Sequence, residues 1–400
     1  MEIFCQLIFW ISFLILVYTY LGYGLLVFFL AKRKKQLPVA VLPEEELPAL
    51  TVLIPAYNEA GCIGAKIRNT LELKYPRTLF RVLVITDGST DGTEQIVKAF
   101  PQVELLHGQE RLGKAMALNR AMEMVETPIV IVTDANALLN QNALRLLVSG
   151  FADPSIGAIS GEKQVGGENQ DELSAEGEGL YWKYESFLKK NDARLYSVVG
   201  AAGELLAFRA ALFQPLEPDT ILDDFVLSMR ICEQGYRIGY EPAAKAFEKG
   251  SLSLRDEEKR KIRIAAGGFQ ALKRLQKSWS WRFNPLLFFQ FISHRVSRWV
   301  FAAPALLLLG VSTLYLVVKG SGSIYQLAGI IQLLFYSLAV LGWLGARTNT
   351  KLPFVYIPYY FVFMHWSIVL GLFRFLTGGQ DAKWEKSDRI RVSVKNDQGQ

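Results

Sequence analysis

The sequence is poor in cysteine and contains none of the common phosphate-binding motifs. Its 400 residues include three cysteines, an odd number, scattered and without C-x-x-C spacing: Cys5, Cys62 and Cys232. This pattern excludes a disulfide framework and a cysteine zinc site, and it fits a reducing compartment. No G-x-G-x-x-G follows the first predicted strand and no G-x-x-x-x-G-K-[ST] occurs, which disfavours dinucleotide and P-loop cradles. Internal repeats and low-complexity tracts are also lacking.

Charge is absent from the start of the chain. Residues 3–31 carry no charged side chain, and about 20 apolar residues suffice to cross the hydrocarbon core of a bilayer. Basic residues come directly after this run: Lys32, Arg33, Lys34 and Lys35. Because cytoplasmic flanks collect positive charge, residues 1–31 are predicted to form an N-terminal transmembrane helix and the region after it to be cytoplasmic. A cleaved signal peptide is the less favoured alternative, since no cleavage pattern follows.

Apolar residues make up 51% of the chain, and three further apolar segments lie near its end, at 300–318, 324–346 and 352–376. They predict a C-terminal transmembrane region at 297–378, followed by a polar tail at 379–400. The third segment contains Pro353 and Pro358, so a full span and a bent or re-entrant course both remain open. Three spans place the tail outside, whereas its basic residues favour the inside, and this conflict also stays open.

The formal net charge is +6. Much of the positive charge lies beside apolar segments, where anionic lipid is a simpler partner than nucleic acid. Segment 255–296 is predicted to form interfacial amphipathic helices, with cations on one side and an apolar face made of Ile262, Ala265, Phe269 and Leu272. An ordinary surface helix packed on a neighbouring domain is the alternative. Membrane lipid is therefore a predicted partner, and nucleic acid is not.

Residues 49–254, which follow a basic flank and linker at 32–48, alternate between two patterns. β-rich runs occur at 50–54, 82–85, 103–106 and 129–132, and helical patterns at 59–73, 91–99, 112–125 and 140–149. Such alternation predicts an α/β fold, with a mostly parallel sheet covered by helices on both faces. Ligands of such sheets bind at the carboxyl ends of the strands.

Polar loops follow three of these strands. They are Pro55-Ala-Tyr-Asn-Glu59, Thr86-Asp-Gly-Ser-Thr-Asp-Gly-Thr93 and Asp134-Ala-Asn136. Each alone could be a turn or a helix cap, but together they predict a cleft with acidic and aromatic walls at one edge of the sheet. Side chains two apart in an extended chain point the same way, so Asp134 and Asn136 could present two oxygens to one hard cation.

Two further features offer charge to this cleft. Lys114 could neutralise a diphosphate, although a solvated lysine at a helix start is the commoner case. Asp223 and Asp224 open a predicted helix, where acidic residues usually act on the helix dipole. The functional interpretation makes Asp224 a general base whose pKa is raised by burial and by its neighbour Asp223.

As a set, these motifs resemble the membrane-bound family 2 glycosyltransferases. The motifs that carry the resemblance are Pro55-x-Tyr-Asn-Glu59, the Asp87 loop, Gly113-Lys-Ala115, Asp134-Ala-Asn136 and Leu222-Asp-Asp224. Their order and spacing are those of the group that contains cellulose, chitin, hyaluronan and poly-N-acetylglucosamine synthases. The resemblance implies a Rossmann-like GT-A fold, a nucleotide-sugar donor that is usually a UDP-sugar, a divalent cation (Mg or Mn) and inversion at the anomeric carbon.

The resemblance also implies roles for individual residues. The nucleotide-sugar donor would contact Ala56, Tyr57, Glu59, Asp87, Lys114, Asp134 and Arg263. Asp134 and Asn136 stand where the metal-binding D-x-D stands, and Asp224 stands at the position of the base that deprotonates the acceptor hydroxyl. Displacement of a diphosphate needs such a base opposite the leaving group and cations beside it.

The sequence departs from the family pattern at three places. Thr86 replaces the first Asp of a usual pair, and Asn136 replaces the second Asp of D-x-D. Arg260-Lys-Ile-Arg263-Ile stands in place of Q-x-x-R-W. An Asn oxygen still suits magnesium or manganese, whereas the loss of the Gln and Trp leaves processive synthesis and single transfer both open.

The predicted function is inverting sugar transfer to a glycan or lipid-linked acceptor, at the cytoplasmic face of a bacterial-type plasma membrane, for polysaccharide synthesis. The alternative is an inactive scaffold subunit that keeps the fold within a membrane complex whose partner subunits are unknown. The joint presence of the residues predicted to carry the chemistry favours the enzyme: Asp87, Lys114, Asp134 and Asp224.

Overall fold

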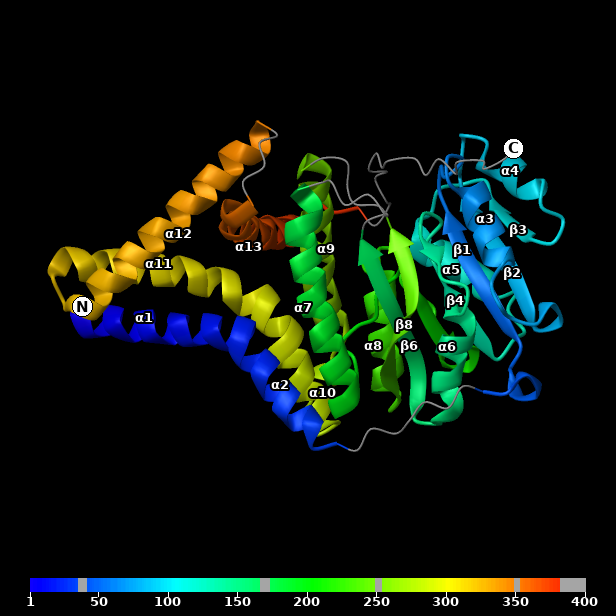
Figure 1. The fold of residues 1–400 in the computed structure, drawn as a ribbon, viewed down its shortest axis with the longest axis horizontal. Helices are drawn as coiled ribbons and strands as arrows, with labels where there is room; N and C mark the ends of the chain where they lie inside the picture. The colour runs from blue at the N-terminus through cyan, green and yellow to red at the C-terminus, as the bar shows by residue number, and fades with distance from the viewer. Residues whose placement is uncertain (35–41, 166–172, 249–253, 349–352, 382–400) are drawn as a thin grey trace, which may run out of the picture. The chain divides into compact units, whose positions relative to one another are not determined.

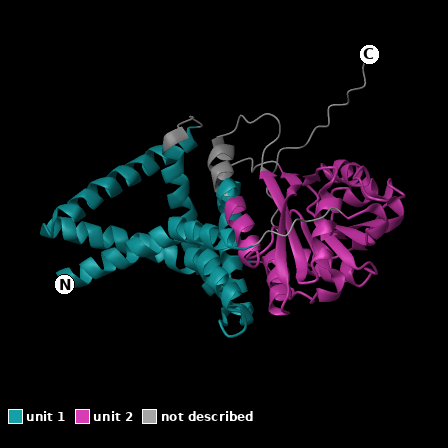
Figure 2. Ribbon diagram, turned by 60° about the horizontal axis from the view of Figure 1, so that its bottom comes forward, with its two compact units in different colours: residues 1–34, 171–184, 253–380 teal, residues 35–170, 185–252, 381–400 magenta. Residues whose placement is uncertain are grey.

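The computed structural model describes residues 1–34, 42–165, 173–248, 254–348 and 353–381. Part of the predicted linker and most of the predicted polar tail, at 35–41 and 382–400, lie outside these residues. The chain divides into two compact units, which Figure 2 distinguishes by colour. We call residues 35–170, 185–252 and 381–400 the sheet unit, and residues 1–34, 171–184 and 253–380 the helical unit.

The sheet unit contains an eight-stranded sheet in the order β3-β2-β1-β4-β7-β6-β8-β5 (Figure 1). Its first half is parallel and consists of β1 Leu50–Ala56, β2 Phe80–Asp87, β3 Glu104–Gly108 and β4 Ile129–Val132. Every residue of β1 is buried, as expected for a central parallel strand covered on both faces. The four strands predicted from the sequence are therefore confirmed.

The second half of the sheet mixes both directions. β7 Leu206–Arg209 pairs antiparallel with β4 and with β6 Ile156–Val165. β8 Arg237–Glu248 pairs parallel with β6 and antiparallel with β5 Leu138–Leu139. Parallel pairings remain the majority, as predicted, but the sequence does not predict the antiparallel strand β7. Its residues Leu-Ala-Phe-Arg lack the β-branched side chains that mark β4, and no crossover helix has to precede an antiparallel strand.

Helices connect the strands of the sheet unit. They are α3 Ile63–Leu71, α4 Thr93–Lys98, α5 Lys114–Met122, α6 Ala143–Ser149 and α8 Asp223–Glu233, with single 3-10 turns at Glu44–Glu46, Arg77–Leu79, Gly150–Ala152 and Ala210–Leu212. α7 Leu173–Leu195 is divided between the two units. The predicted helices are present but shorter, because their predicted first residues form loops. Gly113, for example, has φ 96°, so α5 begins only at Lys114.

The core of the sheet unit fixes where the strands end. Val52 and Ile54 of β1 pack in one buried cluster with Ile63 and Ile67 of α3. Parallel pairing sets Ala56 beside Thr86, the second-last residue of β2. The loops after β1 and β2 therefore leave the sheet at the same edge, as the alternation of strands and helices predicts.

Within its described residues, the helical unit contains four helices that are long and apolar enough to cross a membrane: Glu2–Lys32, Pro285–Lys319, Ser323–Arg347 and Val355–Thr377. The first comprises α1 Glu2–Val17, the π-helical segment η1 Tyr18–Gly22 and α2 Tyr23–Lys32; the second comprises α10 Pro285–Phe291, the π-helical segment η7 Ile292–Phe301 and α11 Ala302–Lys319. α12 Ser323–Arg347 and α13 Pro353–Thr377 follow. Large apolar side chains on these helices are exposed, which requires an apolar surrounding. The protein is therefore a membrane protein.

The amphipathic segment forms α9 Leu254–Arg274, a 3-10 turn at Lys277–Trp279 and then α10. The apolar face of α9 is buried within the helical unit rather than exposed. Phe269 lies 6.2 Å from Phe375 of α13, measured between ring centroids, and Gly371 of α13 lies against the backbone of α9. Protein contacts therefore hold this helix, and the apolar helix that follows begins at Pro285, before the boundary at 297 predicted from the sequence.

Gly371→Ala should destabilise the helical unit. An added Cβ would lie 2.9 Å from both the Ala266 nitrogen and the Ile262 oxygen, backbone atoms that cannot move aside alone. Overpacking of this kind costs about 1–3 kcal/mol. Gly310→Ala is the matched control, because its Cβ would meet no atom nearer than 3.9 Å. Thermal unfolding of the detergent-purified chain measures both, and equal midpoints would contradict the packing described.

Candidate active site

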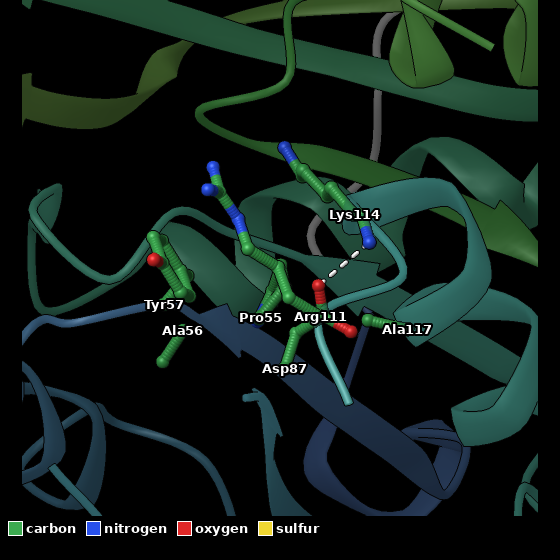
Figure 3. A pocket seen from close by; sticks show the side chains of 8 residues that line it. Pro55, Ala56, Tyr57, Asp87, Arg111, Lys114 and Ala117 are labelled. Carbon is green, nitrogen blue, oxygen red and sulfur yellow. Dashed lines mark hydrogen bonds between the residues drawn. The ribbon is translucent and has the colours of Figure 1, made fainter. Parts of the chain in front are cut away.

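A pocket lies at the edge of the sheet where β1 and β2 end (Figure 3). Its lining residues are Pro55, Ala56, Tyr57, Asp87, Arg111, Gly113, Lys114 and Ala117. Four residues predicted to contact a donor thus lie together: Ala56, Tyr57, Asp87 and Lys114. They come from the ends of two parallel strands and the start of α5, so the sheet topology itself brings them into one place.

The loop after β1 is held by the loop after β2. Asn58 adopts a left-handed conformation with φ 53°, and its Oδ1 accepts a hydrogen bond from the N–H of Thr90 at 2.8 Å. The N–H of Glu59 donates to Thr93 Oγ1 at 2.9 Å. Glu59 thus lies in the loop beside the pocket and is not among its lining residues, and its predicted contact with a donor stays a prediction. The second polar motif positions the first.

Arg111 and Tyr57 form one wall of the pocket. The Arg111 guanidinium lies 4.0 Å from the centroid of the Tyr57 ring, a cation–π contact. Gly88, with φ 67°, leaves room for the backbone of Arg111, because a Cβ at Gly88 would stand 2.8 Å from the Arg111 backbone nitrogen. The sequence analysis did not single out Arg111, although it stands three residues before Lys114.

Asp87 turns its carboxylate into the protein. Oδ2 accepts from the N–H of Gly113 at 2.7 Å, and Oδ1 accepts from the N–H of Leu112 at 3.1 Å and from Arg120 at 3.2 Å. The side chain is 7% exposed. Asp87 therefore shapes the loop that leads into Lys114, and its predicted contact with a donor stays a prediction.

Thr86, the first departure from the family pattern, takes part in a different interaction. It is fully buried, and its Oγ1 shares a hydrogen bond of 3.0 Å with Nδ1 of His107 on β3. His107 in turn lies 2.9 Å from Glu94. The threonine hydroxyl therefore has a hydrogen-bond partner within the sheet.

Lys114 joins two acidic segments. Its ammonium lies 2.8 Å from Asp134 Oδ1 and 3.4 Å from Asp223 Oδ2. Its side chain is 14% exposed, so it is not a solvated lysine at a helix start. Burial alone would lower the pKa of Lys114, but Asp134, Asp223 and Asp224 outweigh this and raise it. The ammonium therefore stays charged.

Asp224 stands in the first turn of α8 beside this ion pair. Its Oδ1 accepts from the N–H of Phe225 at 2.8 Å. Burial, followed by the charge of Asp223, raises the pKa of Asp224 to about 7. Gly203 leaves space at its carboxylate, because a Cβ there would lie 3.0 Å from Oδ2. An acid with these properties can accept a proton near neutral pH.

The turn after β4 carries the two predicted metal ligands, and their chemistry fits a hard cation. Burial raises the pKa of Asp134 above its usual value, against the opposing effect of Lys114. Oδ1 of Asn136 is buried and has no hydrogen-bond partner within the described part of the chain. The described residues contain no group of three His, Cys, Asp or Glu arranged for a metal.

Lys66 lies beneath this turn and was missed from the sequence. It is fully buried, and its ammonium donates to Thr133 Oγ1 at 2.9 Å and to the Ala137 oxygen at 2.5 Å. It thereby binds both sides of the turn. Burial lowers the pKa of Lys66 to about 7. A signal did exist, since the buried face of α3 consists of Ile63, Lys66, Ile67 and Thr70, with a lysine where an apolar residue is expected.

Three other charged residues near the turn left no recognisable pattern in the sequence, because they come from separate segments: Lys163, Glu204 and Glu248.

Arg263, the remaining predicted donor contact, lies in α9 of the helical unit. Its role stays a prediction.

The fold of this chain is similar to that of known proteins. Residues 51–216 match the family Glycosyl transferase family 2. A solved mannosyltransferase from Pyrobaculum calidifontis, in complex with GDP-Man and Mn²⁺, is 25% identical with a TM-score of 0.70, covering 93% of this chain and 100% of that one. The sheet unit and the apolar helices are thus a GT-A domain with transmembrane helices.

Curated relatives point to the same family. The poly-β-1,6-N-acetyl-D-glucosamine synthase of Staphylococcus aureus (strain MSSA476) is 28% identical over 243 residues, 58% of this chain and 57% of the synthase. The corresponding synthase of Staphylococcus epidermidis is 24% identical over 263 residues, 63% and 62% of the two chains. The match thus spans less than two thirds of either synthase. Residues 51–216 thus form a domain that matches glycosyltransferase family 2, and the chain is similar to poly-β-1,6-N-acetyl-D-glucosamine synthases.

Asp87→Ala should destabilise the sheet unit. It removes the acceptor of two backbone N–H groups and one guanidinium, and buried donors left unsatisfied cost about 1–3 kcal/mol. Glu104→Ala is the control, because Glu104 forms an exposed pair with Arg81 at 2.8 Å, worth about 0–1 kcal/mol. Thermal unfolding should show a clearly larger loss for Asp87→Ala. Equal losses would argue against its role in holding the loop.

Proposed function

We propose that this protein transfers a sugar, with inversion, from a nucleotide-sugar donor to a glycan or lipid-linked acceptor at the cytoplasmic face of a plasma membrane, in polysaccharide synthesis. The observation that carries the proposal is the cluster around Lys114. One buried ammonium contacts Asp134 and Asp223, with Asp224 next in sequence and the pocket alongside. A phosphate-binding cation and a base thus occur side by side.

The pocket suits a nucleoside diphosphate. Tyr57 offers an aromatic ring to a base or ribose, while Arg111 and Lys114 offer positive charge to the phosphates. A UDP-sugar is the expected donor on the resemblance to the synthases. The mannosyltransferase complex with GDP-Man makes a guanosine donor the alternative that an experiment must separate.

Asp134 and Asn136 are the residues that would hold a divalent cation, magnesium or manganese. Such a cation, when bound, would supply positive charge to the leaving diphosphate. The turn that carries them is fixed from below by Lys66 and from the side by Lys114. The carboxylate of Asp134 is therefore preorganised before any ligand arrives.

Asp224 is the proposed general base. The acceptor oxygen forms a bond to the anomeric carbon as the bond from that carbon to the diphosphate breaks, and the hydroxyl proton passes to Asp224. Attack opposite the leaving group inverts the anomeric centre. Asp223 contacts Lys114, which leaves its neighbour as the carboxylate available for the proton.

Membrane location fits an acceptor that is lipid-linked or grows at the bilayer. The four apolar helices and the printed names of the relatives, poly-β-1,6-N-acetyl-D-glucosamine synthases, support polymer synthesis. Arg263 is proposed to contact the donor, as the resemblance implies. The departure from Q-x-x-R-W around it makes product length the decisive property to measure.

Detergent-purified full-length protein incubated with a panel of UDP-sugars and GDP-mannose, plus Mn²⁺ and membrane lipid extract, tests the proposal. Release of the nucleoside diphosphate with at least one donor, together with a sugar-labelled product, is expected. Product size separates single transfer from polymerisation. Absence of turnover with every donor, in a protein that still unfolds cooperatively, would favour the inactive scaffold.

Asp224→Asn should abolish transfer while donor binding persists, because the amide cannot accept the proton. In the unchanged protein, kcat/KM should rise with pH and level off above about 7, since the raised pKa of Asp224 keeps the base protonated at lower pH. Asp219→Asn, on the loop before α8, is the control. Retained turnover in Asp224→Asn, or a rate that falls between pH 6 and 8, would remove the assignment.

A further inference from the structure

The side chain of Asn136 is oriented by an acid far away in the sequence. Its Nδ2 donates to Oε1 of Glu248, the last residue of β8, at 2.8 Å. The reverse orientation would bring two oxygens together, so the hydrogen bond decides which amide atom faces away. That atom is Oδ1, which is buried and without a hydrogen-bond partner within the described residues. An orphaned oxygen of this kind points to a ligand that accepts electron pairs.

Glu248 is itself held by a buried lysine. Its other oxygen, Oε2, pairs with the ammonium of Lys163 on β6, which also pairs with Glu204. The side chains of Lys163 and Glu248 are each 3% exposed. Because Lys163 keeps Glu204 as a second partner, Glu248 can be neutralised without leaving the ammonium unpaired.

The charges around the turn leave an excess of negative charge. Among the described residues, five carboxylates lie in this network, and three ammonium groups oppose them. The carboxylates are Asp134, Asp223, Asp224, Glu204 and Glu248, and the ammonium groups are Lys66, Lys114 and Lys163. When all are ionised, five minus three leaves two negative charges, which one divalent cation would neutralise.

Asn136 and Glu248 specify each other. An aspartate at position 136 would set a second carboxylate within hydrogen-bond distance of Glu248, and two like charges so close cannot both stay ionised. With asparagine at position 136, the negative charge lies on Glu248 at the end of β8 instead of on the turn. A hydrogen bond between the two side chains then replaces the repulsion. The total charge of the pair equals that of an aspartate beside a glutamine.

We propose that Glu248 is a positioning residue of the cation site, which holds Asn136 with Oδ1 toward the cation and supplies the charge that the second position of the turn lacks. This inference rests on the proposed function, in which Asp134 and Asn136 hold the cation. Lys163 fixes Glu248 in place. Glu248 thus acts on the cation through Asn136 and through its charge.

The test compares the affinity of the full-length protein for UDP in Mn²⁺ with its affinity in EDTA, measured by titration calorimetry in detergent. The ratio of the two affinities is the gain that Mn²⁺ provides. GDP replaces UDP if the donor panel selects a guanosine donor. Glu248→Gln should reduce this gain by about tenfold, as loss of such a supporting partner usually does. The affinity in EDTA and the unfolding midpoint should stay unchanged. A general loss of structure would alter both.

A reciprocal pair makes the test sharper. Asn136→Asp combined with Glu248→Gln reverses the hydrogen bond and keeps the total charge, so it should recover most of the gain lost in Glu248→Gln. Asn136→Asp alone should show a smaller Mn²⁺-dependent gain in UDP affinity than this double variant. Glu162→Gln is the matched control, because Glu162 is a buried acid next to Lys163 that pairs with Ser186 and Tyr240; it should keep the full gain.

Asp134→Ala tests the cation site separately from the role of Glu248. If it retains the Mn²⁺-dependent gain, the cation site of the proposed function fails, and the role of Glu248 fails with it. If Asp134→Ala loses the gain but Glu248→Gln keeps it, only the role of Glu248 is overturned. A double variant no better than Glu248→Gln would overturn it as well.

Discussion

The site depends on one buried ammonium that three segments of the chain share. Lys114 opens α5, Asp134 follows β4 and Asp223 opens α8, and the two carboxylates lie 2.8 and 3.4 Å from its nitrogen. A buried charge that loses its partner costs about 3–5 kcal/mol, so the ion pairs hold α5, the turn after β4 and α8 in fixed positions relative to one another. The pocket wall, the predicted cation ligand and the predicted base are thereby fixed relative to one another before a substrate binds.

Departures from the family pattern make physical sense when their neighbours are considered. Thr86 replaces an acid beside His107 on the next strand, and its hydroxyl lies 3.0 Å from Nδ1 of that histidine. Asn136 replaces an acid where Glu248 already supplies a carboxylate at 2.8 Å. In both cases the substituted side chain forms a hydrogen bond with its neighbour, and at position 136 an aspartate would repel that neighbour. Such exchanges preserve a site while changing its motif.

The sequence predicts the parts of the molecule that depend on local pattern. Strands near Leu50, Val82 and Ile129 and the polar loops after them follow from periodicity, and parallel pairing then brings Tyr57, Asp87 and Lys114 together. Pairings between distant segments leave no such pattern. Nothing near Glu248 indicates that it meets Asn136, 112 residues away. Short antiparallel strands such as β7, and the burial of the apolar face of α9 against α13, are likewise decided by tertiary packing.

The turn after β4 and the start of α5 are proposed to bind an activated sugar through its diphosphate. The most direct measurement is an experimental structure of the full-length protein with Mn²⁺ and UDP or GDP, in which anomalous scattering locates the metal. We expect manganese bound by Asp134 and by Oδ1 of Asn136, with the diphosphate beside Lys114. Manganese and nucleotide on any surface away from these residues would contradict it.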